Sequence, residues 1–155
     1  MPTAHVAADA RIDASAERVY SIMADYRDGH PHILPKPYFS SLEVDRGGIG
    51  AGTVIRFQMH ILGVTRELRG EVTEPQPGRV LVESYPEDGS VTTFTIDPEK
   101  DGQSCHIMIT TDFNVRGGPF GWIQAWATRM MLRKIYKREL AQLAEFATRQ
   151  QAPRP

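Results

Sequence analysis

Six segments of alternating apolar and polar residues follow one another between Tyr38 and Asn114, and this run constrains the fold more than any other feature. Side chains that alternate with a period of two are typical of β-strands with one buried face. The gaps between the segments are short and rich in turn-forming residues, so consecutive strands are expected to pair as antiparallel hairpins. Parallel pairing would need crossovers of about a dozen residues, for which the gaps leave no room. The strands are expected at 38–45, 53–62, 64–74, 79–85, 90–97 and 104–114.

Different elements flank this run on both sides. Residues 6–12 alternate in the same way and predict a first strand, after which Ser15 offers an N-cap to a short amphipathic helix over 16–26. Three prolines follow in the segment 27–37 and allow one helical turn at most. At the other end, Gly117-Gly118-Pro119 opens a long helix from Phe120 to about Arg149.

The element order predicts an α+β fold of one domain over residues 1–150, with 151–155 as a frayed tail. The apolar face of the sheet needs a cover, and the long terminal helix is the only expected element large enough to provide it. We therefore expect a curved, seven-stranded antiparallel sheet wrapped around the C-terminal helix, with two short helices after strand 1. Space between a curved sheet and a straight helix is where a pocket forms.

Composition excludes several classes of protein. The net charge of −1 argues against a nucleic-acid binder, and one cysteine excludes an internal disulfide and a multi-thiolate metal site. No apolar stretch approaches the roughly 18 residues that a transmembrane helix needs. The first residues lack a basic region followed by an apolar run, so the expected location is cytoplasmic. No cofactor is expected.

At several points the chain resembles the SRPBCC superfamily, the helix-grip fold shared by START lipid-transfer domains, birch-pollen-type allergens and polyketide cyclases. The resemblance covers about residues 4–148. It rests on the element order and on four local features, namely the opening 12–20, the Ala24-Asp25-Tyr26 that closes the short helix, the Gly50-Ala51-Gly52-Thr53 that begins a strand, and the Gly-Pro that leads into the long helix. The closest branch looks like the polyketide cyclase/dehydratase and lipid-transport group, and residues 24–35 are also similar to the coenzyme-Q-binding branch. The resemblance implies a cavity for polyketides, isoprenoid quinones or lipids.

Arg66 is the most informative single candidate for a binding residue. Alternation places it on the apolar face of its strand, together with Leu68 and Val72. A guanidinium there stays charged and needs a partner. One interpretation is an outward bulge or an internal salt bridge to a carboxylate, and the other is an anchor for a carboxylate, phenolate or carbonyl of a bound ligand.

Aromatic and methionine side chains of the helix and the facing strands are the candidates for apolar contacts with a ligand, because they adapt to irregular apolar shapes. Ordinary core packing is the alternative for each of them. The candidate ligand-binding residues besides Arg66 are Tyr26, Phe57, Met59, Phe94, Trp122, Trp126 and Met130.

His30 and His32 are the candidates for acid/base chemistry near neutral pH, on a loop expected at the pocket entrance. Two imidazoles at this spacing are also compatible with zinc or iron, but a third ligand would have to come from Asp25, Asp28 or His60, and no spacing selects one. No metal site is therefore predicted.

The helix carries a basic stripe of Arg129, Arg133 and Lys137, with Lys134 and Arg138 beside it. A solvated face is the simpler interpretation, and transient docking on an acidic partner or an anionic membrane surface is the other.

These features predict a binding or carrier protein for a small hydrophobic ligand, held between the sheet and the C-terminal helix. The alternative is a polyketide cyclase/dehydratase-type enzyme that uses acid/base residues of the same cavity, with Tyr26, His30 or His32 acting beside Arg66. A third interpretation is a protein-interaction module that uses the basic helix face.

Overall fold

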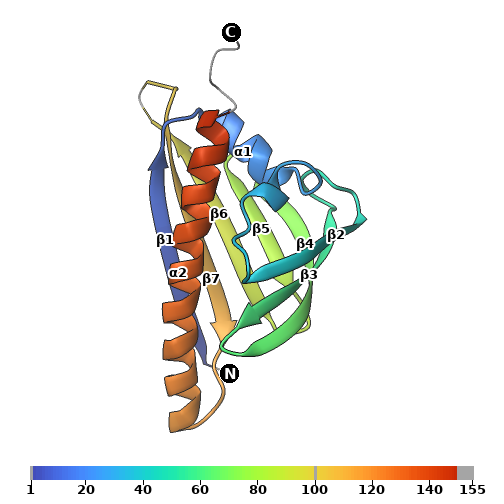
Figure 1. Cartoon of the computed structure of the whole chain (residues 1–155), viewed down its shortest axis with the longest axis vertical. Coiled ribbons are helices and arrows are strands. Elements are labelled where there is room, and N and C mark those ends of the chain that lie inside the picture. The colour runs from blue at the N-terminus through green and yellow to red at the C-terminus, as the bar shows by residue number, and fades with distance from the viewer. Residues whose placement is uncertain (1, 100, 150–155) are drawn as a thin grey trace.

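A seven-stranded antiparallel sheet with the strand order β1-β7-β6-β5-β4-β3-β2 forms most of the computed structural model, which describes residues 2–99 and 101–149 (Figure 1). The tail expected at 151–155 lies outside the described residues. The expected meander is confirmed, since each strand from β2 to β7 pairs antiparallel with the next along the chain. The structure adds that β1 pairs antiparallel with β7. The strands are β1 Thr3–Ile12, β2 Phe39–Arg46, β3 Val54–Ile61, β4 Val64–Gln76, β5 Val80–Tyr85, β6 Ser90–Pro98 and β7 Cys105–Asn114.

Two short helical segments, α1 (Ala16–Ala24) and η1 (His30–His32), follow β1. Ser15 caps α1 as expected, because its Oγ accepts a hydrogen bond from the backbone N–H of Arg18 at 3.1 Å. The helix ends two residues before the expected boundary. The reason is that the backbone N–H of Tyr26 donates to the Gly48 carbonyl at 2.8 Å, which draws the chain out of the helix and onto the loop before β3.

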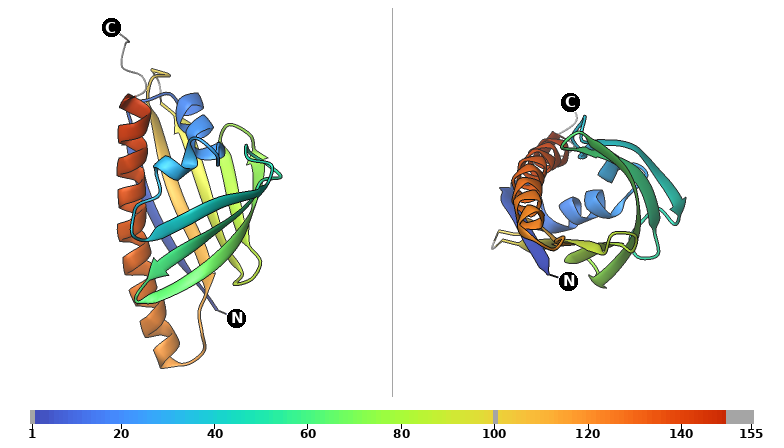
Figure 2. Two further views of the ribbon diagram at one scale, coloured as in Figure 1. Left: turned by 45° about the vertical axis from the view of Figure 1, so that its right-hand side comes forward. Right: turned by 90° about the horizontal axis from the view of Figure 1, so that it is seen from below.

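The long helix α2 (Pro119–Arg149) lies along the concave side of the sheet and covers it. Seen along its axis, the sheet curls into an open ring that α2 closes on one side, while α1 lies within one end (Figure 2). The helix buries one stripe, which contains Leu132, Tyr136, Leu140, Leu143 and Ala147. The fold is therefore the expected helix-grip fold.

The alternation of the strands places their side chains as expected. In β7, Cys105, Ile107, Ile109 and Thr111 are buried beneath the helix, and the residues between them are more exposed. In β3, Ile55 and Phe57 are buried on the same concave face. No helix in the described part of the chain is both long and apolar enough to cross a membrane.

Candidate functional site: a cavity between the sheet and helix α2

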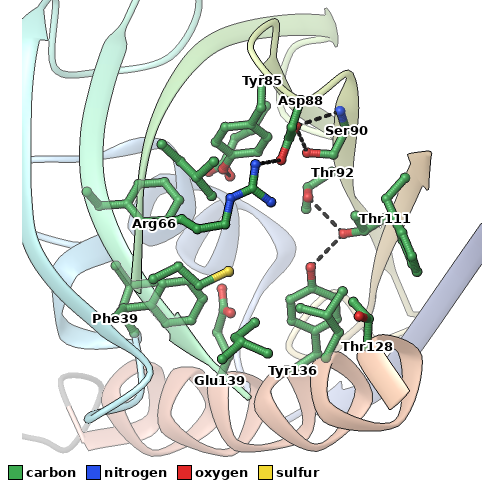
Figure 3. Close-up of a pocket in the computed structure, with 18 of the residues that line it drawn as sticks. Phe39, Arg66, Tyr85, Asp88, Ser90, Thr92, Thr111, Thr128, Tyr136 and Glu139 are labelled. Atoms are coloured by element: carbon green, nitrogen blue, oxygen red, sulfur yellow. Dashed lines mark hydrogen bonds and ion pairs between the residues drawn. The ribbon is translucent and has the colours of Figure 1, made fainter. Parts of the chain in front are cut away.

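A cavity of about 670 Å³ remains between the concave face of the sheet, α2 and η1 (Figure 3). This volume lies within the range of roughly 300–1,000 Å³ that is typical of small-molecule sites. The curvature of the sheet produces it, because strands β2 to β4 bend away from the straight helix while β1 stays packed against it.

One wall of the cavity is apolar and comes mainly from β2, β3 and β4. Alternate residues of β3 point into the cavity because they share the concave face of the strand. The ring of Phe57 packs against Phe39, with centroids 5.7 Å apart, and edge-on against Tyr85 at 5.8 Å. The apolar lining residues are Leu34, Phe39, Leu42, Ile55, Phe57, Met59, Ile61, Leu62, Val64, Leu68, Phe94, Phe113 and Leu132.

Glu83 forms the centre of a buried polar network at the inner end of the cavity. It lies on β5 and is 5% exposed, and its two carboxylate oxygens accept hydrogen bonds from Tyr26 (Oε1, 2.6 Å) and Tyr85 (Oε2, 2.5 Å). His30 donates through Nδ1 to the carbonyl of Met23 at 2.7 Å and places Nε2 3.8 Å from Oε1 of Glu83. Burial, with the nearby Glu83 charge, raises the pKa of Tyr26 and of Tyr85 well above the usual value, so both tyrosines remain donors.

Glu139 is a second buried carboxyl, and it enters the cavity from α2. It is 3% exposed, and in Figure 3 its side chain rises from the helix toward the open space. No other side chain or backbone group of the described residues forms a hydrogen bond or ion pair with it. Burial raises the pKa of Glu139 well above its usual value, and the charge of Glu83 adds to this effect. The raised pKa favours the neutral form of Glu139, and a neutral carboxyl can donate a hydrogen bond into the cavity.

A chain of hydroxyl groups crosses the cavity wall between the sheet and α2. Thr92 Oγ1 bonds to Thr111 Oγ1 at 2.8 Å, and Thr111 Oγ1 bonds to the Tyr136 hydroxyl at 2.6 Å. Burial raises the pKa of Tyr136, so its hydroxyl keeps its proton. These bonds fix the helix side of the cavity relative to β6 and β7.

Arg66 lies at the more exposed side of the same cavity. Its side chain is 58% exposed, and its Nη2 lies 3.7 Å from Oδ2 of Asp88. Ser90 holds Asp88 by donating to Oδ1 from its hydroxyl at 2.6 Å and from its backbone N–H at 2.8 Å. The cavity thus has an apolar wall, an acidic inner end and an arginine at its mouth.

The comparison with protein families shows which family the chain belongs to. Residues 3–147 match the family described as polyketide cyclase / dehydrase and lipid transport. The chain belongs to this family. It is a member of the SRPBCC, or START-like, superfamily, as the resemblance in its sequence predicts. A search of curated proteins finds no match.

Solved structures share this fold at low sequence identity. The KanY protein has 23% identity and a TM-score of 0.83, with 96% of this chain and 99% of that chain covered. A START superfamily protein from Mycobacterium smegmatis has 16% identity and a TM-score of 0.71 (94% and 97% covered). The Zhui aromatase/cyclase from Streptomyces sp. R1128 has 20% identity and a TM-score of 0.70 (96% and 95% covered).

In this family member the cavity contains several of the residues that the sequence singles out. Phe57, Met59, Phe94, Arg66 and His30 all line it. Arg66 shares the concave face with Leu68 as expected, but it is half-exposed at the mouth instead of buried among apolar side chains, because β4 extends past the edge of the core there. Its partner is a carboxylate, which agrees with the salt-bridge interpretation, and its contact with a ligand stays a prediction.

Two other candidates lie beside the cavity without lining it. Tyr26 is 1% exposed and acts on the site through its hydrogen bond to Glu83. His32 is exposed and stacks on Phe146 at 4.8 Å, whereas the His30 ring stacks on Tyr26 at 4.5 Å. Within residues 2–99 and 101–149, no three His, Cys, Asp or Glu side chains gather as metal ligands would.

The structure places Trp122, Trp126 and Met130 on the outer face of α2, outside the cavity. They are 55%, 63% and 54% exposed. The first half of α2 is apolar on several sides, and only one of these sides faces the sheet. The helix residues that do line the cavity are Gln124, Thr128, Leu132, Tyr136 and Glu139.

Sequence reasoning missed Glu83 and Glu139. Both interrupt an apolar pattern: Glu83 alternates with buried Leu81 and Tyr85, and Glu139 lies on the helical stripe that contains Tyr136 and Leu143. Both could have been identified from the sequence, because each is a charged residue at a position where the apolar pattern predicts a buried side chain.

Gly70 on β4 provides the room that the Tyr85 ring occupies. A Cβ at this position would lie 2.8 Å from Cε1 of Tyr85 and 3.2 Å from Cγ1 of Ile55. We expect Gly70→Ala to displace the ring and weaken its bond to Glu83, with a loss of about 1–3 kcal/mol in the free energy of unfolding. Urea titration would measure this loss. Gly117→Ala is the matched control, since its Cβ would meet open space, and equal losses in the two variants would contradict the packing argument.

Proposed function

We propose that the protein binds a small, largely apolar molecule with an oxygen-bearing polar end in this cavity and acts as its carrier. The observation that carries the proposal is a cavity of about 670 Å³ with an apolar wall and an unpartnered buried acid, Glu139, at its inner end. Apolar contact supplies affinity of roughly 25 cal/mol per Å² before ordering costs are subtracted. Polyketides and lipids are the ligand classes that the family's description suggests. The similarity of residues 24–35 to the coenzyme-Q-binding branch adds isoprenoid quinones.

The polar side chains of the cavity determine the orientation in which such a ligand would bind. A neutral Glu139 donates a hydrogen bond to a carbonyl or phenol oxygen, and that contact satisfies a group that is otherwise unpartnered. The apolar body lies against Phe57, Met59 and Phe94. Arg66 at the mouth contacts a second polar group where the ligand has one.

Native mass spectrometry of freshly purified protein tests the proposal. We expect a co-purifying molecule, and we expect Thr128→Trp to reduce its occupancy because the indole would fill part of the cavity that Thr128 lines. Thr95→Trp on the outer face of β6 is the matched control and should keep the molecule. If Thr128→Trp and Thr95→Trp retained the same amount, the ligand would lie elsewhere.

Arg66→Leu addresses the polar contact at the mouth. We expect it to weaken binding of the fluorescent probe anilinonaphthalene sulfonate by about tenfold, because a charge-assisted hydrogen bond contributes about 1.5–3 kcal/mol. The fold should be unaffected, since the side chain is 58% exposed. Arg46→Leu on β2 is the control. Unchanged affinity in Arg66→Leu would remove Arg66 from the site.

A second candidate function is a cyclase/dehydratase-type enzyme, and one observation favours it. Two carboxyl groups, Glu83 and Glu139, line the same cavity in different settings, one accepting two hydrogen bonds and the other unpartnered with a raised pKa. Such a pair can hold a carbonyl oxygen with the neutral acid while a base removes the adjacent carbon-bound proton. His30 is a further candidate base.

Hydrogen exchange into an aryl methyl ketone distinguishes the enzyme from the carrier. In deuterium oxide an enzyme would remove a methyl proton and return a deuteron, which proton NMR detects. Loss of this exchange in Glu139→Gln, with ketone binding retained, would support catalysis. Absence of exchange with bound ketone would leave the carrier as the function. A cytoplasmic location stays a prediction.

A further inference from the structure

The outer face of α2 carries a concentration of exposed apolar side chains that neither the core nor the cavity uses. Five large hydrophobic residues within three helical turns are between 54% and 83% exposed. Exposed apolar patches of this kind mark interaction sites far more often than single exposed residues do. We call this set the outer apolar face: Phe120, Trp122, Ile123, Trp126 and Met130.

Cations follow directly along the same helix. Residues 116–138 contain no Asp or Glu, and they contain six basic residues: Arg116, Arg129, Arg133, Lys134, Lys137 and Arg138. Met130 and four of these cations, Arg133, Lys134, Lys137 and Arg138, line a shallow depression on the outside of α2. The exposed side of the helix is therefore apolar in its first turns and basic in the next.

We propose that this side of α2 docks on an anionic membrane surface. Indole rings prefer the boundary between headgroups and acyl chains because they are apolar with one polar tip. Lysine and arginine side chains are attracted to the phosphate groups of anionic lipids, and their long stems let the charge stay in the headgroup layer while apolar neighbours insert. Aromatic residues beside cations without intervening acids are the composition of an interfacial helix.

The position of the cavity mouth agrees with docking at this end of the molecule. The first turns of α2 extend beyond the edge of the sheet (Figure 1). Leu62 and Val64, at the turn between β3 and β4, are 51% and 56% exposed, and they line the cavity together with Arg116 and Gln124 of the α2 end. A docked molecule would thus bring an apolar cavity rim close to the lipid, which gives a hydrophobic ligand a path that avoids water.

The two tryptophans of the chain are Trp122 and Trp126, so tryptophan fluorescence reports on the outer apolar face alone. The experiment adds vesicles of phosphatidylcholine and phosphatidylglycerol in equal parts to the full chain, with pure phosphatidylcholine vesicles for comparison. We expect co-sedimentation and a blue shift of the emission with the anionic vesicles only. We also expect binding to weaken as salt is added, because salt screens the attraction between cations and lipid.

Matched variants distinguish insertion of the outer apolar face into the membrane from nonspecific binding to vesicles. Ile123→Asp keeps both reporters and should weaken vesicle binding by about tenfold or more, since it places a carboxylate in the apolar contact. Ile49→Asp makes the same change at a 73% exposed isoleucine away from α2 and should bind as the parent does. Lys134→Glu should also weaken binding, whereas Arg46→Glu on β2 should not.

Three results would overturn the proposal. The first is no binding to anionic vesicles by folded protein. The second is binding without an emission shift and without an effect of Ile123→Asp, which would indicate a purely electrostatic surface such as one for an acidic protein. The third is a dimer in solution that Ile123→Asp converts to a monomer, which would assign the face to a second copy of this chain. Each of these results leaves ligand retention in the mass-spectrometric test unchanged, so the docking surface and the cavity can fail separately.

Discussion

Glu139→Gln is expected to increase the free energy of unfolding at pH 8 by about 1–3 kcal/mol. The carboxyl is 3% exposed, and burial raises its pKa well above the ordinary value. Above the unfolded-state pKa of about 4.3, the unfolded chain releases this proton while the folded chain retains it. As the pH rises, the free energy of the proton-releasing unfolded state therefore falls relative to that of the folded state, and the folded protein loses stability. Glutamine has a similar shape and no proton to lose, so it removes this destabilisation.

The pH dependence of this stabilisation shows whether the ionisation of Glu139 causes it. The stabilisation by Glu139→Gln should be small near pH 4.5 and should grow with pH until the folded carboxyl ionises. Urea titrations of both proteins from pH 4.5 to pH 8 would measure it, and Glu145→Gln on the exposed side of α2 is the matched control. A constant difference across the pH range, or an equal gain from Glu145→Gln, would contradict the assignment.

A buried acid that destabilises its own fold is expected where a ligand or a reaction needs it. Because the amide of Glu139→Gln still donates a hydrogen bond, we expect carbonyl ligands to remain bound in this variant. Glu139→Leu removes the donor and should release them. Retention by both variants would show that Glu139 does not contact the ligand.

Glu83→Leu is expected to have the opposite effect and to cost about 3–5 kcal/mol of folding free energy. Its carboxylate accepts from the hydroxyls of Tyr26 and Tyr85, and His30 lies 3.8 Å away. Leucine would leave the two buried hydroxyl groups of Tyr26 and Tyr85 without their acceptor. Thermal and urea unfolding would measure the loss. Glu87→Leu, an exposed position in the turn after β5, is the control and should change stability little.

A double-mutant cycle tests whether the loss arises from the hydrogen bonds. Tyr26→Phe should destabilise the parent protein, because one oxygen of Glu83 loses its donor. In the Glu83→Leu background the same change should cost less or nothing, since the hydroxyl it removes is already unsatisfied. Additive effects would show that the network is not the source of the stability. If Glu83→Leu does not fold, Glu83→Gln completes the same cycle.

The strand pattern is the part of this protein that could be predicted most fully. A strand with one buried face has a side-chain period of two, so Ile55, Phe57 and Met59 could be assigned to one side before any contact was known. The short gaps then required antiparallel neighbours. The resemblance to the SRPBCC superfamily added the place of the cavity, between sheet and helix, and the structure has it there.

The orientation of helix α2 could be predicted from the sequence pattern only in part. Its later half has one apolar stripe, and Tyr136, Leu140 and Leu143 are buried as that stripe predicts. Its first half is apolar on several sides, and a helical period cannot select one of them. The contact with β1 turns Gln124 and Thr128 toward the cavity and leaves Trp122 and Trp126 outside.

The sequence by itself determined the strands, the hairpin pairing from β2 to β7 and which faces are apolar, because these depend on neighbours within a short distance along the chain. Only the tertiary structure decided the polar site, since Tyr26 and Glu83 lie 57 positions apart and meet through sheet curvature and the position of α1. The raised pKa of Glu139 is likewise a property of its surroundings, because burial by other elements creates it.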